Sequence, residues 1–250
     1  MRSRTDAAPS EPTTKRVLIT AGPTYEPIDA VRFIGNRSSG RLGVAIAEDW
    51  SRAGWAVTLL LGPNAATPVA PGIEAVRFGS AADLQALLDE HLGRCAVLIM
   101  AAAVGDYRPV AGEADLSGKR RRAGPLTLEL EPTPDLLAGC AARSRPDHLL
   151  VGFALEPREG LLDSAERKLM RKGIDLIVAN PLETMDAGEI EATLLGRTDR
   201  GAAVLDSTGG PVRKEEFASW LRERVEGLLA ERRAAGAGGP RQTTGEAGDG

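Results

Sequence analysis

The chain has 250 residues, of which 42% are hydrophobic and 26% charged, and its formal net charge is −4 at pH 7. This length is enough to bury one good core, and the negative charge argues against non-specific binding of nucleic acid. No stretch reaches the roughly eighteen apolar residues that a membrane span needs. The two cysteines, Cys95 and Cys140, lack the paired spacing of a metal site or a disulfide framework. We therefore expect a cytoplasmic protein that binds neither nucleic acid nor a membrane.

The two ends of the chain differ in composition from the rest. Residues 1–14 are mostly Ser, Thr, Pro, Ala and charged residues, without the apolar run of a signal peptide, and residues 234–250 are rich in glycine. Segments of such composition bury too little apolar surface to fold. We expect a disordered leader at 1–14, one globular domain at 15–233 and a disordered tail at 234–250.

An apolar run at 17–19 opens the globular sequence and predicts a buried parallel strand that ends at Gly22. The loop after it continues as far as Ser38, Ser39 and Gly40, where we expect a helix to start, and long loops in compact domains are usually functional. The two serines can cap the helix and Gly40 allows close backbone approach. The unpaired N–H groups of the helix start therefore favour an anion, and we expect phosphate. A tight helix entrance without a ligand is the alternative.

Two common phosphate-binding motifs are not met in this segment. Gly35 and Gly40 have the spacing of a P-loop, but Arg41 and Leu42 stand where Lys and Ser or Thr would hold phosphate and Mg²⁺. The G-x-G-x-x-G fingerprint of a dinucleotide fold is absent as well. What remains is a looser glycine-rich turn between a strand and a helix.

Apolar runs and helical periodicity alternate along the rest of the chain. Strands are predicted at 56–61, 73–78, 96–100, 126–130, 149–153 and 174–180, and helices at 42–53, at 81–92, from about Asp135 onward, through 165–172 and at 214–233. Two short apolar runs at 192–195 and 202–205 flank a polar turn and predict a hairpin. Strands that alternate with helices favour right-handed parallel units. The predicted fold class is α/β, a Rossmann-like, doubly wound and mostly parallel sheet with an added β-hairpin.

The loop at 101–109 follows a buried strand, at the sheet end where open parallel sheets bind ligands. Small residues, among them Ala102 and Ala103, leave room for a flat or bulky ligand, and Asp106 adds charge. The alternative is a strand end that turns on small residues, with Asp106 as a cap.

A basic run, Gly-Lys-Arg-Arg-Arg, occupies residues 118–122. It can form a mobile cationic lid over phosphate, because Lys and Arg stabilise charge on a phosphorus under attack. The alternative is a solvated charge run. No Ser-His-Asp or Cys-His set is evident, so a site built from positioning and positive charge fits phosphoryl or nucleotidyl transfer.

Taken whole, the segment at 20–40 closely resembles the phosphopantothenate-cysteine ligase family, the ligase domain of the bacterial coenzyme A biosynthesis bifunctional protein. The matching words are T-A-G-P-T, E-P and V-R-F-I-G-N-R-S-S-G. Further on, A-A-A-V-G-D-Y-R-P from Ala101 is similar to the family's A-A-V-A-D-Y-R. The segment around Phe153 is similar to G-F-A-A-E-T, and D-L-I-V-A-N ends at Asn180, which can also be an ordinary turn residue. The resemblance covers about residues 15–232.

The resemblance implies a ligase that joins 4'-phosphopantothenate and L-cysteine into 4'-phosphopantothenoylcysteine. CTP with Mg²⁺ would activate the carboxylate as an acyl cytidylate, with release of pyrophosphate and then of CMP. ATP remains open as the nucleotide, and family members usually form homodimers. By the same resemblance, Asn36 holds the acyl group and supports attack of the cysteine amine, Arg32 is a cation near phosphate or carboxylate, and Lys119 assists nucleotidyl transfer.

The remaining site residues that the resemblance implies bind substrate or nucleotide, and none is a metal ligand. Ala102 and Ala103 shape the nucleotide pocket, Asp106 contacts the nucleotide, Phe153 lines the site, and Gly22, Ser38, Ser39, Gly40 and Asn180 complete the set. The sequence departs from the family's words at Gly105, Arg120, Leu155 and Pro157.

Two other functions stay open. An NAD(P)-dependent reductase would use the generic strand, turn and helix at the start, but the fingerprint is absent and Tyr107 is followed four residues on by Ala111 rather than Lys. A non-catalytic nucleotide-binding module would use the same loops for affinity alone. Related bacterial ligases are commonly fused behind a flavin-dependent decarboxylase. Only a short polar leader precedes Lys15, so we expect ligase activity without decarboxylation.

Overall fold

A computed structural model describes residues 15–112, 114, 116–121, 124–184, 187–199 and 201–234. The leader expected at 1–14 and all but the first residue of the tail expected at 234–250 lie outside the described residues, as do Arg122 of the basic run and Arg200 of the predicted hairpin turn.

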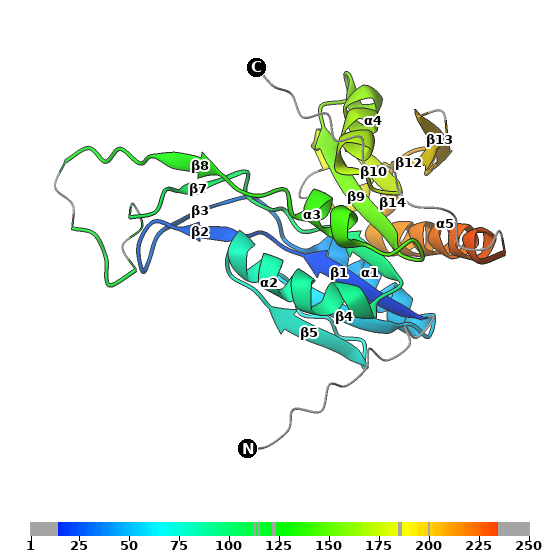
Figure 1. Cartoon of the computed structure of the whole chain (residues 1–250), viewed down its shortest axis with the longest axis horizontal. Helices are drawn as coiled ribbons and strands as arrows, with labels where there is room; N and C mark the ends of the chain where they lie inside the picture. Colours follow the sequence, from blue (N-terminus) through cyan, green and yellow to red (C-terminus); the bar gives the residue numbers. More distant parts are fainter. Residues whose placement is uncertain are drawn as a thin grey trace.

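The centre of the fold is an eight-stranded sheet with the order β13-β12-β10-β9-β6-β1-β4-β5 (Figure 1). Its strands are β1 (Arg16–Ala21), β4 (Ala56–Leu61), β5 (Ile73–Arg77), β6 (Val97–Met100), β9 (Leu149–Glu156), β10 (Leu176–Pro181), β12 (Thr193–Thr198) and β13 (Gly201–Ser207). The strands from β10 to β5 are parallel, whereas β12 and β13 pair antiparallel as the predicted hairpin. This confirms the Rossmann-like fold class, and the strand order reverses between β1 and β6, where such folds bind ligands.

Helices cover both faces of the sheet (Figure 1). One layer contains α1 (Arg41–Arg52) and α5 (Lys214–Ala234), and the other contains α2 (Ala81–His91), α3 (Leu136–Arg143) and α4 (Leu161–Lys172). Val17 and Ile19 of β1 pack in the core on the α1 and α5 side, and Leu18 packs on the other side. Because both faces are buried, β1 reads as a continuous apolar run rather than an alternating one.

Four short strands extend away from this body as an arm (Figure 1). In it, β2 (Tyr25–Pro27) pairs with β3 (Phe33–Gly35), and β7 (Tyr107–Pro109) pairs with β8 (Leu130–Pro132), both antiparallel. We use the name arm for the described residues of 25–35 and 107–132. Short elements complete the fold: the 3-10 helices Leu92–Arg94 and Leu182–Thr184, and the paired strands β11 (Glu189–Ile190) and β14 (Val212–Arg213).

Two local predictions were wrong. The strand predicted at 126–130 forms only at Leu130–Pro132, because the alternating segment has no sheet face to pack against, and Leu126 is 52% exposed. Helix α1 begins at Arg41, and its N-cap is Gly40 with φ +69°, so neither Ser38 nor Ser39 caps it. Close packing explains the glycine, since a Cβ on Gly40 would lie 2.7 Å from the Cβ of Ala65.

Among the described residues, the helices are all too short or too polar to cross a bilayer.

Candidate functional site

A cavity of about 920 Å³ opens where the long loop after β1 and the loop after β6 meet the starts of α1 and α3 and the end of β9. This is the crevice at the strand-order reversal, beyond the carboxyl ends of the parallel strands. The size is in the range of sites that hold small molecules and cofactors. Several separate stretches of chain line it, chiefly 36–43, 100–107 and 132–137.

Most of the residues that the sequence singled out line this cavity, although they come from distant parts of the chain. Those brought together are Asn36, Ser38, Ser39, Gly40, Ala102, Ala103, Asp106, Phe153 and Asn180. Gly22, Arg32 and Lys119 are not among the lining residues. Gly22 lies behind the cavity wall, where its backbone, at φ +86°, packs closely against Gly62.

Asn36 is fixed to the opposite wall of the cavity. Its Nδ2 donates a hydrogen bond of 2.9 Å to the carbonyl oxygen of Val104, in the loop that follows β6. With the amide nitrogen engaged in this way, the side-chain oxygen of Asn36 is the atom left to accept a hydrogen bond from a ligand. Asn180 is held as well, because its Nδ2 donates to the hydroxyl of Thr184 at 3.2 Å.

Three cations on α4 also line the cavity, although no sequence motif indicated a role for them. Lys168, Arg171 and Lys172 are spaced i, i+3 and i+4, which places them on one side of the helix. Lys168 forms an ion pair with Glu156 and Lys172 one with Asp135, whereas Arg171 has no ion pair with a described residue. In the sequence, charged residues at helical spacing predict an ordinary solvated helix face. Only the folded structure shows that these three cations line the cavity.

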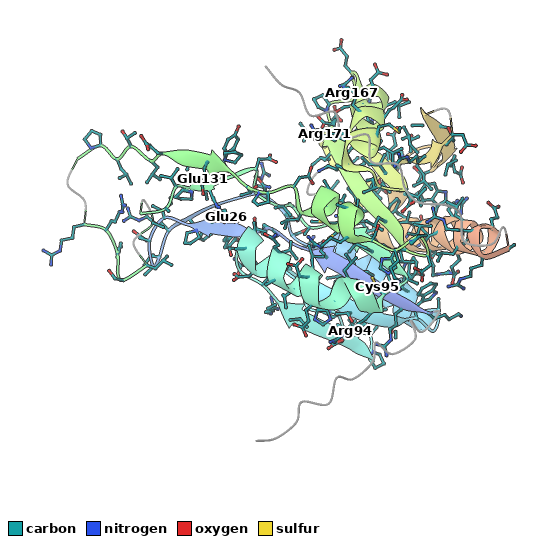
Figure 2. All side chains as sticks on the ribbon, viewed as in Figure 1. Glu26, Arg94, Cys95, Glu131, Arg167 and Arg171 are labelled. Carbon is teal, nitrogen blue, oxygen red and sulfur yellow. The ribbon has the colours of Figure 1, made fainter. Side chains whose placement is uncertain are left out.

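Figure 2 shows Arg167 and Arg171 along this same helix α4. Both are exposed, but Arg171 lines the cavity and Arg167 does not. The pair therefore offers a matched comparison of two arginines on one helix.

Asp135 belongs both to the cavity wall and to the start of α3. It is the N-cap of α3 and accepts a hydrogen bond of 3.1 Å from the N–H of Ala138. Burial opposes its charge, but the bonds from Lys172 and Ala138 outweigh this and hold the pKa of Asp135 below its usual value. The carboxylate stays ionised and paired at neutral pH.

The cavity wall carries a surplus of positive charge. Its described cations are Arg37, Arg41, Lys168, Arg171, Lys172 and Lys214, and its acids are Asp106 and Asp135. A cleft lined mainly by cations attracts and holds polyanionic ligands. Across the described part of the chain, no three His, Cys, Asp or Glu side chains gather as metal ligands would.

Arg32 and Lys119 lie on the arm instead. The guanidinium of Arg32 holds Asp29 through Nε at 2.9 Å and through Nη2, and Nη2 also donates to the carbonyl of Arg120 at 2.8 Å. Asp29 also accepts bonds from the N–H groups of Val31 and Arg32. The hydrogen bond from Arg32 is the main reason why the pKa of Asp29 is well below its usual range. Arg32 therefore ties the turn of β2 and β3 to the basic run, and Lys119 beside it is exposed.

Comparisons with known proteins agree on one family. The family described as DNA/pantothenate metabolism flavoprotein C-terminal domain matches residues 13–226. The chain is 41% identical over 197 residues to the coenzyme A biosynthesis bifunctional protein CoaBC of Mycolicibacterium smegmatis, covering 75% of this chain and 47% of that protein. It is 42% identical over 174 residues to a protein named cysteine/cysteine sulfinic acid decarboxylase, from an unknown prokaryotic organism. That match covers 70% of this chain and 48% of that protein. The chain thus spans about half the length of the curated relatives it matches.

Solved structures show the same likeness. The C-terminal domain of a CoaBC protein superposes with a TM-score of 0.69 at 33% identity, covering 87% of this chain and 96% of that one. A DNA/pantothenate metabolism flavoprotein from Streptococcus pneumoniae gives 0.72 at 28% identity, covering 86% and 99%. A Cab2 mutant in complex with phosphopantothenate-cysteine gives 0.70 at 21% identity, covering 88% and 89%, and at that identity shows the shared fold alone.

Proposed function

Because the chain belongs to the family of DNA/pantothenate metabolism flavoprotein C-terminal domains, we propose that it is a cytoplasmic ligase that forms 4'-phosphopantothenoylcysteine from 4'-phosphopantothenate and L-cysteine, using CTP. The observation that carries this proposal is the cavity itself. It has a surplus of cations for phosphorylated substrates, and Asn36 faces it with its amide nitrogen already engaged. The printed titles of the CoaBC relatives support a role in coenzyme A biosynthesis.

The first step activates the carboxylate of phosphopantothenate. A carboxylate oxygen attacks the α-phosphorus of CTP, the bond between that phosphorus and the bridging oxygen to the β-phosphate breaks, and pyrophosphate leaves. The product is an acyl cytidylate. The α4 cations, above all Arg171, stabilise the charge on the phosphates during this transfer.

The reaction also needs Mg²⁺, and the acids of the cavity do not suit it as a protein-held ion. Asp135 is committed to Lys172 and to the cap of α3, and among the described residues of the wall Asp106 is the other acid. We therefore propose that Mg²⁺ is bound by the phosphate oxygens of CTP, as is usual for nucleotide substrates.

The second step joins the two substrates. The neutral amine of cysteine attacks the acyl carbon, the bond to the cytidylate oxygen breaks, CMP leaves with that oxygen, and the proton lost from the nitrogen passes to solvent. The side-chain oxygen of Asn36 accepts a hydrogen bond from the attacking amine and orients its lone pair toward the carbonyl. The bond to Val104 fixes the amide so that this oxygen, rather than the nitrogen, faces the substrate.

We also propose a homodimer built through the arm. The arm exposes several large apolar side chains, namely Val31, Phe33, Tyr107, Leu116, Leu126 and Leu130. Apolar groups clustered on a protruding element are typical of a protein contact surface. Such a dimer also accounts for Arg32 and Lys119, which lie away from their own cavity and would act at the cavity of the second copy.

The ligase proposal is tested by pyrophosphate release from the purified chain with phosphopantothenate and L-cysteine, supplying CTP or ATP in turn. We expect release that depends on phosphopantothenate and prefers CTP. The matched variants Arg171→Gln and Arg167→Gln sharpen the assay, since only the first should raise the KM for the nucleotide, by about tenfold. Absence of release with both nucleotides would contradict the proposal.

Shared sites in a dimer are tested by mixing Asn36→Asp and Lys119→Gln, two variants expected to form almost no 4'-phosphopantothenoylcysteine, under conditions that exchange subunits, and measuring that product. If one site takes Asn36 from one copy and Lys119 from the other, mixed dimers regain one intact site and the mixture about a quarter of the parent activity. A mixture as inactive as its components would show that both residues act within one copy or that no dimer forms.

A further inference from the structure

The backbone at 103–106 forms part of the cavity wall. Asn36 donates a hydrogen bond to the carbonyl of Val104, and Asp106, two residues further along, also lines the cavity. This segment belongs to no strand of the fold. Its contact with a neighbouring segment of the sheet is an isolated β-bridge between Ala103 and Pro23. Its position therefore depends on a few individual hydrogen bonds.

One of these bonds comes from a fully buried side chain that is not part of the cavity wall. The hydroxyl oxygen of Thr24 accepts a hydrogen bond of 2.9 Å from the N–H of Gly105, and the N–H of Thr24 donates to the carbonyl of Ala103 at 3.2 Å. Thr24 directly precedes β2. The start of the arm and the cavity-lining backbone at 103–105 are therefore joined at this residue.

A second threonine completes the attachment from the other strand pair. The hydroxyl of Thr133 donates to the carbonyl of Gly105, and its N–H donates to the carbonyl of Asp106 at 2.9 Å. Thr133 follows β8 and lines the cavity. Both polar groups of Gly105 are thus bound to threonine hydroxyls at the base of the arm.

We propose that Thr24 is a positioning residue for the nucleotide: its hydroxyl holds Gly105 and thereby sets the place of Asp106 relative to Asn36. This rests on the proposed function in that the cavity binds a nucleotide beside Asp106. Without the hydroxyl, the N–H of Gly105 would be a buried donor with no acceptor, and the loop would move to satisfy it. Small displacements of a positioned group cost one to two orders of magnitude in rate.

Two substitutions at Thr24 separate the hydroxyl from the packing. Thr24→Val keeps the size and branching but removes the acceptor, and Thr24→Ser keeps the acceptor but removes the methyl. The matched control is Thr58→Val, which removes a hydroxyl bonded to Glu74 at 3.0 Å in the sheet. For each purified full chain we would measure the Kd for CTP, the kcat and KM of the ligase assay, and the melting temperature.

We expect Thr24→Val to weaken CTP binding by about tenfold or more, while Thr24→Ser and Thr58→Val bind CTP within about twofold of the parent. A merely structural role would lower the melting temperature and the amount of active protein without changing the Kd of the folded fraction. Equal CTP binding by parent and Thr24→Val would overturn the proposal, and so would a Thr24→Ser variant as weak as Thr24→Val.

The direct binding measurement keeps this result separate from the ligase proposal. If the parent binds CTP but makes no product, the ligase proposal fails, and the comparison of the two Thr24 variants still decides the role of the hydroxyl. A parent chain that bound neither CTP nor ATP would overturn the positioning role together with the nucleotide site.

Discussion

Replacing Arg222 with methionine will destabilise the fold by removing an ion pair that links α5 to α1. The guanidinium of Arg222 donates to Asp49 through Nε and to Glu226 through Nη1, each at 2.7 Å. Asp49 also accepts a bond of 2.7 Å from the hydroxyl of Ser219, and Glu226 accepts one of 2.8 Å from the indole of Trp55. The side chains of Arg222 and Asp49 are only 18% and 10% exposed. The cluster therefore anchors the C-terminal half of α1, and the first turn of α1 lines the cavity.

The expected cost follows from what remains after the substitution. Removing one partner of a buried ion pair costs about 3–5 kcal/mol, because the other charge stays buried without its counterion. Here both carboxylates keep a neutral hydrogen-bond donor and Glu226 is partly solvated, so we expect about 2–3 kcal/mol. For a chain of this size, such a loss lowers the melting temperature by about 4–12 °C.

Denaturant unfolding followed by circular dichroism measures this difference. The matched control is Arg213→Met, just before α5, because the Arg213–Glu216 pair has side chains 67% and 50% exposed and should contribute less than about 1 kcal/mol. Adding Asp49→Asn to Arg222→Met should recover part of the loss, since the stranded charge is removed. An Arg222→Met variant no less stable than Arg213→Met would refute the reasoning.

Three further predictions concern titration and catalysis. Burial raises the pKa of Cys95 to about 12 and that of Cys140 to about 11. Neither thiol should therefore react with a disulfide reagent at pH 8 until the chain is unfolded. Rapid labelling of the native protein would contradict this prediction. Asn36→Asp places a carboxylate oxygen where the amide nitrogen donates to the carbonyl of Val104, so that hydrogen bond is lost. We expect the amide-forming step to slow about a hundredfold while pyrophosphate exchange continues. Loss of both steps together would point to misfolding of the site. Because the pKa of Asp135 is lowered in the folded protein, the stability that its ionised form gives to the fold is fully present at pH values above the ordinary pKa of 3.8. That contribution is lost only as the pH falls through the lower pKa of the folded state. An NMR titration midpoint of Asp135 at or above 3.8 would disprove this prediction.

Much of the fold could be predicted from the sequence because its elements have local signatures. The apolar run at 56–61 coincides with β4, and the helix predicted at 214–233 ends one residue before α5 does. Continuous apolar runs are typical of strands buried on both faces, and the helices carry apolar residues at helical spacing. Where this logic failed, at 126–130, an alternating pattern had no neighbouring layer to bury its apolar side.

The candidate site was predictable only in part, and the division has a physical cause. Asn36, Asp106 and Phe153 stand in words that resemble a known family, so the sequence alone indicated them. The cations of α4 belong to no such motif, and their spacing is the same as that of a solvated helix face. A site made from groups distant in the chain is defined by distances between them, and those distances exist only after folding.

The sequence by itself indicated most strands of the central sheet and the helices around it, the parallel α/β class and the family resemblance, because apolar periodicity and short polar motifs are local properties. The tertiary structure decided that Lys168, Arg171 and Lys172 face the cavity while Arg32 and Lys119 lie on the arm. It also joined Thr24 to Gly105 across 81 positions of the chain. Such contacts are formed by packing and backbone topology, to which residues far apart in sequence contribute jointly, and no local pattern records them.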